Sequence, residues 1–321
     1  MNREEIVSEL QKHDQTVLSF PDRGPWGESK YRGNCSGWIQ AFLAWKYQVK
    51  KFAELFAGSG TGSDVCKDMG IDYIGADLNP NPVRSNILSV NAVTDDVPDE
   101  FYGADMVFMH PPYGAEIRIP YADSMWKDTT GGNLSQFDLG QMQWDRFMKQ
   151  LNAIVMKYYA SMESGSRMSI LMGDVRRNGL HSMLTDIVKP GELEQIIIKM
   201  QHNTVSGRNG QSYGGFKKFV PLVHEYILVL KKLAPYLIHY QLPTDHELDI
   251  RDSKSATWKD VVYAAMSKLK TSSLDAIYRE IDGHTKTKTN PNWQACVRRT
   301  LQETACFNNV ERGVWQLVAA A

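Results

Sequence analysis

The residues best suited to chemistry stand together at positions 110–113, where His110, Pro111, Pro112 and Tyr113 follow an apolar run over 105–109. The run is typical of a buried strand, and two prolines would end it in a rigid turn. Tyr113 could stack on a flat ring, while His110 and the main-chain carbonyl of Pro111 accept hydrogen bonds from an amino group on its edge. This stretch therefore predicts a site for a planar ring that carries an amino group.

A glycine-rich turn upstream forms the second candidate site. The segment 52–56 reads as a strand that runs into the glycines of 57–62. Glycines let the backbone approach a ligand, and the helix expected over 63–69 would point its amino end at that ligand. The next strand, 73–77, ends in Asp77, whose carboxylate would accept hydrogen bonds from ribose hydroxyls. The glycine spacing departs from the Gly-x-Gly-x-x-Gly pattern, which disfavours NAD.

The elements that position these residues alternate between strands and helices. Strands are expected at 52–56, 73–77, 87–93, 105–109, 167–172, 193–200 and 225–230, and helices at 3–14, 38–49, 63–69 and 144–159. This alternation predicts an α/β fold, with a doubly wound, mostly parallel, seven-stranded Rossmann-like sheet. Ligands of such sheets bind outside the carboxyl ends of the strands, where Gly58, Asp77, His110 and Asp174 fall.

Composition limits the class of protein. With 321 residues, 42% of them hydrophobic and 23% charged, the chain can bury a large domain and a smaller one. We find no apolar run of membrane-spanning length and no signal-peptide pattern in the sequence. We therefore expect a cytoplasmic protein, with neither a membrane partner nor export. Its 4 cysteines lack metal or disulfide spacing, so no metal site is predicted.

The C-terminal part predicts a separate module. A first domain is expected over 1–232, a linker over 233–256, and three helices with a terminal hairpin over 257–321, an order that suggests a winged helix. From residue 251 onward the chain carries 11 Lys and Arg against 7 Asp and Glu, a local excess of +4 in a chain of net charge −1. A DNA-binding role fits this charge, and a protein-interaction module is the alternative.

The motifs in this order resemble those of a known family. Phe56-Ala-Gly58-Ser-Gly60, followed by Asp77 and by His110-Pro-Pro-Tyr113, is similar to the S-adenosylmethionine (SAM)-dependent DNA amino-methyltransferases of the N6-adenine and N4-cytosine class. The resemblance covers roughly residues 20–232. The module at 257–321 is similar to winged-helix modules appended to restriction and other DNA-processing enzymes.

The resemblance implies SAM as the cofactor and DNA as the partner, together with a cognate restriction or defence system and a DNA-associated place in the cell. The cofactor would be bound by Lys30, Tyr31, Phe56, Ala57, Gly58, Gly60, Asp77, Leu78, Asn91 and Asp95. The target base would leave the helical stack, and the catalytic set would be His110, Pro111, Pro112 and Tyr113. DNA would be contacted by Arg176, Arg208, Lys217, Lys218, Lys286, Lys288, Arg298 and Arg299.

One departure from the family pattern concerns the base. His110 stands where the family has Asp, Asn or Ser, and a neutral imidazole accepts a hydrogen bond on only one nitrogen. Adenine N6 is the first expected target of methylation, and cytosine N4 is the second. RNA or protein-amide methylation, and a non-catalytic SAM-sensing DNA-binding protein, are the other hypotheses.

Overall fold

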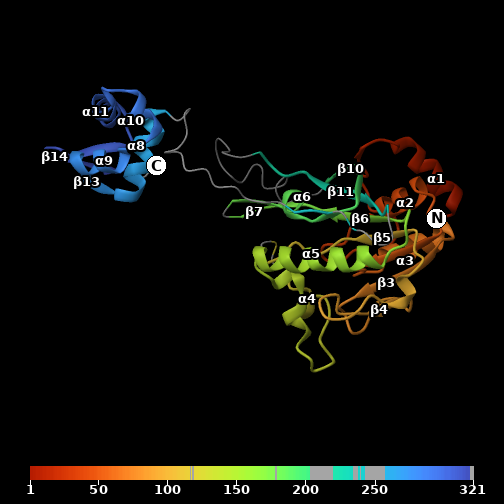
Figure 1. Ribbon diagram of the computed structural model, residues 1–321. Helices are drawn as coiled ribbons and strands as arrows, with labels where there is room; N and C mark the ends of the chain where they lie inside the picture. Colours follow the sequence, from red (N-terminus) through yellow and green to blue (C-terminus); the bar gives the residue numbers. More distant parts are fainter. Residues whose placement is uncertain are drawn as a thin grey trace. The chain divides into compact units, whose positions relative to one another are not determined.

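The computed structural model describes residues 1–115, 117, 119–177, 179–202, 220–233, 238, 240–242 and 257–318. The chain divides into two compact units, 1–243 and 244–321 (Figure 1). The division falls inside the segment 233–256 that the sequence predicts as a linker.

Unit 1 is built around one large sheet. Among the described residues, eight strands pair in the order β1-β10-β11-β6-β5-β2-β3-β4. Their bounds are β1 Val17–Leu18, β2 Lys51–Leu55, β3 Asp72–Asp77, β4 Ile87–Ser89, β5 Met106–Met109, β6 Arg167–Met172, β10 Glu192–Met200 and β11 His224–Lys231. Only β11 runs antiparallel to its neighbours in this sheet. The predicted α/β, doubly wound, mostly parallel fold is confirmed, and the predicted strand number is corrected, because β1 adds an eighth strand.

Helices cover both faces of the sheet (Figure 1). The face with α1 (Arg3–Leu10), α2 (Gly37–Lys46) and α3 (Thr61–Met69) buries Phe52 and Phe108. The opposite face, with α5 (Trp144–Ser161), buries Ala53 and Met109. Successive strand residues thus enter different cores, which is why these strands read as continuous apolar runs. Burial of a phenylalanine or methionine side chain at these positions stabilises the fold by about 1.5–3 kcal/mol.

The direction of winding changes beside β2. From β2 the chain moves through β3 to β4 on one side, and then returns to place β5 on the other side. Ligands of doubly wound sheets bind at such a reversal, outside the carboxyl ends of the strands. We therefore expect a ligand site among the residues that follow β2, β3 and β5.

The remaining elements of unit 1 are short. They are η1 Gln11–His13, η2 Asp99–Phe101, α4 Tyr121–Ser124, η3 Leu134–Phe137, η4 Leu139–Gln141, β7 Asp174–Arg176, β8 Leu180–Ser182, α6 Met183–Asp186, β9 Lys189–Pro190 and β12 Tyr240–Gln241. The strands β7 and β8 form a hairpin, and β9 pairs with β12. Across the part of the chain that is described, no helix has the length and apolar character needed to cross a membrane.

Unit 2 has its own core. It consists of α8 Trp258–Leu269, β13 Thr271–Ser273, α9 Leu274–Ile281, α10 Thr285–Thr289, α11 Trp293–Glu303, β14 Phe307–Glu311 and β15 Val314–Leu317. Thr257 caps α8, and its hydroxyl accepts a hydrogen bond from the Asp260 amide at 3.2 Å. The strands form an antiparallel sheet in the order β13-β15-β14, packed on Val261, Ile277 and Leu301.

Candidate functional site

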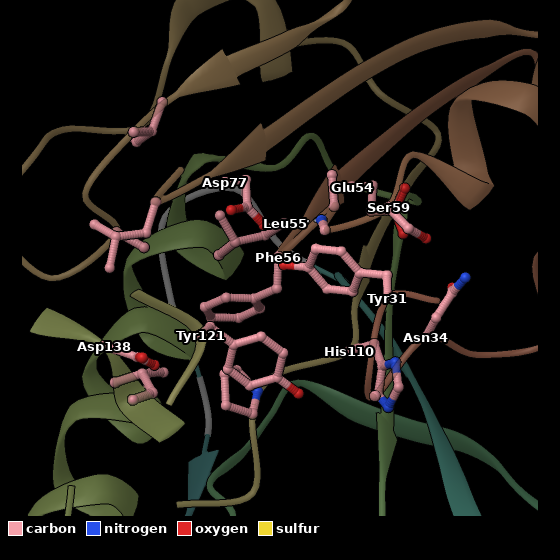
Figure 2. A pocket seen from close by; sticks show the side chains of 18 of the residues that line it. Tyr31, Asn34, Glu54, Leu55, Phe56, Ser59, Asp77, His110, Tyr121 and Asp138 are labelled. Carbon is pink, nitrogen blue, oxygen red and sulfur yellow. Dashed lines mark hydrogen bonds between the residues drawn. The ribbon is translucent and has the colours of Figure 1, made fainter. Parts of the chain in front are cut away.

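A pocket lies where the winding reverses. It encloses about 830 Å³ of empty space, part of it open to solvent. Residues from the ends of β2, β3 and β5 line it, together with the loop before α2 and the segment from Tyr121 to Leu139 (Figure 2). One cavity thus contains both the glycine turn and the start of the His-Pro-Pro-Tyr turn.

The glycine turn holds an unusual backbone conformation. Phe56, Gly58 and Gly60 all have positive φ, at 65°, 47° and 76°. The turn leads into α3 at Thr61, so the amino end of α3 follows it directly. A Cβ added to Gly58 would lie 3.1 Å from a ring carbon of Tyr31, so the ring would have to shift by a few tenths of an ångström. Glycine is therefore favoured at position 58 first by φ and then by this close contact.

Asp77 closes the turn from the neighbouring strand. Its carboxylate accepts hydrogen bonds from the amides of Gly58 at 2.8 Å and Asn79 at 2.9 Å. Burial raises the pKa of this carboxyl, and the two amides oppose the rise. The acid at the end of β3 is thus fixed at the pocket wall, where the sequence places it.

Two tyrosines face each other in the pocket. Tyr31 and Tyr121 stack with ring centroids 6.1 Å apart and an angle of 27° between the planes, and Figure 2 shows both rings in the cavity. Burial raises the pKa of both, that of Tyr121 to about 12, so each stays neutral at physiological pH. The sequence predicts Tyr31 and misses Tyr121, because the turn α4 that carries Tyr121 has no motif.

A buried acid in β2 was also missed. Glu54 is 3% exposed, lines the pocket, and accepts hydrogen bonds from Gln40 Nε2 and Tyr73 Oη, each at 2.5 Å. Burial raises the pKa of Glu54 to about 8, so the carboxyl is protonated at neutral pH. The signal available in the sequence was a lone acid inside an otherwise apolar strand.

The His-Pro-Pro-Tyr turn divides between two environments. His110 and Pro112 line the pocket, whereas Pro111 and Tyr113 are not among its lining residues. The Tyr113 ring packs on Gly173, where an added Cβ would lie 3.1 Å from the ring. Its hydroxyl lies 3.2 Å from His110 Nε2. Stacking of Tyr113 on a ligand ring stays a prediction.

The hydroxyl of Tyr113 also reaches β11. It donates a hydrogen bond to Glu225 Oε1 at 2.8 Å, and Glu225 is paired with Lys199 of β10. Burial would raise the pKa of Glu225, but the charge of Lys199, the field of His110 and the hydrogen bonds from Lys199 and Tyr113 together outweigh it and hold that pKa at about 2. Burial lowers the pKa of His110 to about 4, against the pull of the Glu225 carboxylate. His110 is therefore neutral and Glu225 is ionised at physiological pH.

The structure gathers most of the predicted cofactor residues. Those that line the pocket are Tyr31, Phe56, Ala57, Gly58, Asp77, Leu78 and Asn91. Lys30 is exposed, an added Cβ on Gly60 would meet Arg84, and the Asp95 carboxylate accepts a hydrogen bond from the Asn91 amide at 2.8 Å. None of these three lines the pocket, and Asp95 closes the turn that presents Asn91.

The predicted DNA contacts lie in separate places. Arg176 is exposed on the hairpin of β7 and β8, and Arg208, Lys217 and Lys218 lie outside the described residues. In unit 2, Lys286 lies over the Trp258 ring, and Lys288 is exposed on α10. On α11, Arg298 donates to Tyr278 Oη at 2.9 Å, and Arg299 pairs with Glu303 at 2.9 Å. Arg298, Arg299 and Lys288 are exposed.

Comparison with known proteins finds only distant likenesses. No family model and no curated protein matches the chain. Among solved structures, TrmN from Thermus thermophilus is 14% identical, with a TM-score of 0.37 over 63% of this chain and 50% of that one. Human N-acetylserotonin methyltransferase in complex with SAM is 12% identical, with a TM-score of 0.28 over 61% of this chain and 53% of that one.

A third solved structure is 1,6-didemethyltoxoflavin-N1-methyltransferase of Burkholderia thailandensis, with bound 1,6-didemethyltoxoflavin and S-adenosylhomocysteine. It is 11% identical, with a TM-score of 0.34 over 72% of this chain and 87% of that one. The chain matches about half the length of TrmN and of the human enzyme. Two of the three contain SAM or S-adenosylhomocysteine.

Proposed function

We propose that unit 1 is a SAM-dependent methyltransferase whose acceptor is the exocyclic amino group of a DNA base, adenine N6 first and cytosine N4 second. The observation that carries this proposal is that one pocket is lined by both the Gly58 turn and His110. A cofactor held at the turn would lie beside a hydrogen-bond acceptor for the reacting amino group. Such proximity is the main requirement of an in-line transfer.

The residues of the pocket fit SAM. The Asp77 carboxylate suits a pair of ribose hydroxyls, and Gly58, which has no side chain, lines the same pocket. The rings of Tyr31 and Tyr121 offer flat walls, and aromatic faces also attract cationic groups such as a sulfonium. When bound, SAM supplies a methyl group attached to a positively charged sulfur.

His110 gives the acceptor side of the reaction. A neutral imidazole accepts a hydrogen bond from an amino N–H, whereas a protonated one cannot. The low pKa of His110, set by burial, keeps the ring in the accepting form. Such a bond would localise the nitrogen lone pair that the base ring otherwise delocalises. The base must leave the helical stack to reach His110.

Unit 2 would bring DNA to unit 1. Its order of helices and its terminal hairpin β14–β15 agree with a winged-helix module, in which α11 would enter the major groove. Arg298, Arg299 and Lys288 are exposed cations on α10 and α11. Cations at such positions hold phosphates and add little sequence information.

Methyl transfer tests the proposal for unit 1. The protein would be incubated with methyl-labelled SAM and, in parallel, with duplex DNA, single-stranded DNA, RNA and a mixture of proteins. We expect label in DNA. Label only in RNA or protein would transfer the proposal to those substrates. Binding of SAM without transfer to any of them would favour a non-catalytic SAM-sensing protein.

DNA affinity across a salt series tests the proposal for unit 2. The double variant Arg298→Ala and Arg299→Ala should bind DNA more weakly, and the slope of log affinity against log salt should fall by about 1 for each lost phosphate contact. Lys268→Ala is the matched control, because Lys268 is an exposed cation of the same unit that is paired with Glu280 at 2.9 Å. Equal slopes for the wild type and the double variant would favour a protein-interaction module.

A further inference from the structure

Four side chains form a continuous hydrogen-bonded row across the strand ends. Lys199 pairs with Glu225, Glu225 accepts from Tyr113 Oη at 2.8 Å, and Tyr113 Oη lies 3.2 Å from His110 Nε2. Lys199 and Glu225 are direct partners in the register of β10 and β11, so the sheet itself fixes the far end of the row. The side chain of Glu225 is 7% exposed, and that of Lys199 is 15% exposed.

The donors and acceptors in this row can be assigned one by one. The Lys199 ammonium has only donors, and an ionised Glu225 has only acceptors. Tyr113 owns a single hydroxyl proton, which the contact with Glu225 uses. The Tyr113 oxygen can therefore only accept at its contact with His110, so Nε2 of His110 must carry a hydrogen. In a neutral ring, the other nitrogen, Nδ1, then carries the lone pair.

We propose that Lys199, Glu225 and Tyr113 are positioning residues that hold neutral His110 in the Nε2–H tautomer, so that Nδ1 is the atom that accepts the substrate's amino N–H. This inference rests on the function proposed above. His110 lines the pocket, whereas the other three residues of the row do not. Within the described part of the chain, no hydrogen bond occupies His110 Nδ1, so this atom stays available to a ligand.

The fixed tautomer would also select the substrate. An acceptor at Nδ1 pairs with a base that presents N–H at the reacting edge, as adenine and cytosine do. It meets the carbonyl oxygen of guanine, thymine or uracil with a repulsive pairing of two acceptors. An unmatched polar contact in a buried site is costly, so the row would favour amino-bearing bases over keto-bearing ones.

The tautomer can be read directly in the wild-type protein. Histidine labelled with ¹⁵N gives distinct nitrogen shifts for N–H and for a lone-pair nitrogen, and the His110 signals are assigned by their loss in His110→Asn. At pH 7 we expect Nε2 to be protonated and Nδ1 to be bare. A protonated Nδ1, an equal mixture of tautomers, or an imidazolium would each overturn the inference.

Two variants test the row itself. Tyr113→Phe leaves the Lys199–Glu225 pair intact and removes the acceptor at Nε2, so the ratio of Nε2–H to Nδ1–H should fall by about tenfold, the usual weight of one hydrogen bond. Glu225→Ala removes the acceptor of the Tyr113 hydroxyl and should lower the same ratio, provided that circular dichroism shows a folded protein. An unchanged ratio in Tyr113→Phe would overturn the inference whatever Glu225→Ala shows.

The chain offers a matched control. His224 Nε2 and Tyr226 Oη form a second His–Tyr contact, at 2.9 Å, at the start of β11. Tyr226→Phe removes a comparable hydroxyl and should leave the His110 ratio unchanged; an equal fall there would overturn the inference. The readout does not require catalysis: a protonated Nε2 without methyl transfer would contradict only the proposed function, and transfer with a protonated Nδ1 would contradict only this inference.

Discussion

The Asp77 carboxylate accepts a hydrogen bond from the Gly58 amide at 2.8 Å, which ties the end of β3 to the turn after β2. Through this contact, the end of β3 and the turn after β2 form one wall of the pocket. It also leaves the acid at the edge of the pocket, with burial raising its pKa.

Replacement of Asp77 should affect the cofactor before it affects the fold. Asp77→Asn removes one charged acceptor, and SAM affinity measured by calorimetry should fall by about 10- to 100-fold, the weight of a hydrogen bond to a charged group. Asp96→Ala is the control, because Asp96 is exposed and does not line the pocket. An equal loss of affinity in Asp96→Ala would show that the effect of Asp77→Asn does not come from the pocket.

Gly58 and Gly70 allow backbone strain to be separated from a clash. Both have positive φ, but an added Cβ meets the Tyr31 ring at Gly58 and nothing within 4 Å at Gly70. Each change to alanine should lower the free energy of unfolding by about 1 kcal/mol through strain. Only Gly58→Ala should also weaken SAM binding. Unaltered SAM affinity in Gly58→Ala would argue against a ligand at this turn.

Glu54 should make stability depend on pH. Its pKa is about 8 in the folded protein and near 4.5 in an ordinary carboxyl, so between these values the folded state holds a proton that the unfolded state has lost. The stabilisation is complete below pH 4.5 and disappears as pH rises toward 8, at about 1.4 kcal/mol for each unit of pKa difference. The thermal unfolding temperature of the wild type should therefore fall relative to that of Glu54→Gln as the pH rises from 5 to 8. If the two unfolding temperatures change in parallel with pH, the raised pKa is contradicted.

His110 should set the acid limit of the proposed methyl transfer. Since its pKa is about 4 and the neutral ring is the acceptor, methyl transfer should hold its rate from pH 7 to about pH 5 and fall as pH approaches 4. His110→Asn has no titrating ring, so a fall that persists in it belongs to another group, such as Asp77. A midpoint near 6.5 in the wild type would mean that His110 is solvated as in an ordinary histidine.

The sequence predicted the parts of the fold that are locally encoded. The apolar run at Arg167–Met172 has the same bounds as β6, because strands buried on both faces show as continuous hydrophobic stretches. The two-residue edge strand β1 was missed, since Val17 and Leu18 gain their pairing only from β10. In unit 2 the sequence predicts three helices, whereas the described residues contain four, α8 to α11.

In the site, too, the locally encoded residues could be predicted and those that depend on distant contacts could not. Asp77 is the last residue of β3 and His110 follows β5, so their place at the carboxyl edge could be inferred from topology alone. The contact between Tyr113 and Glu225 joins residues 112 positions apart, and the sequence around either residue does not indicate it. The same holds for Tyr121, which reaches Tyr31 through the fold of the segment after the Pro-Pro turn.

Nucleoside analysis tests the central claim most directly. DNA would be incubated with the protein and methyl-labelled SAM, digested to nucleosides and examined by mass spectrometry. We predict label on adenine N6, a rate lower by about 100-fold in His110→Ala, and an unchanged rate in His224→Ala, whose histidine does not line the pocket. Bound SAM with no labelled nucleoside, or equal rates for wild type and His110→Ala, would contradict the account.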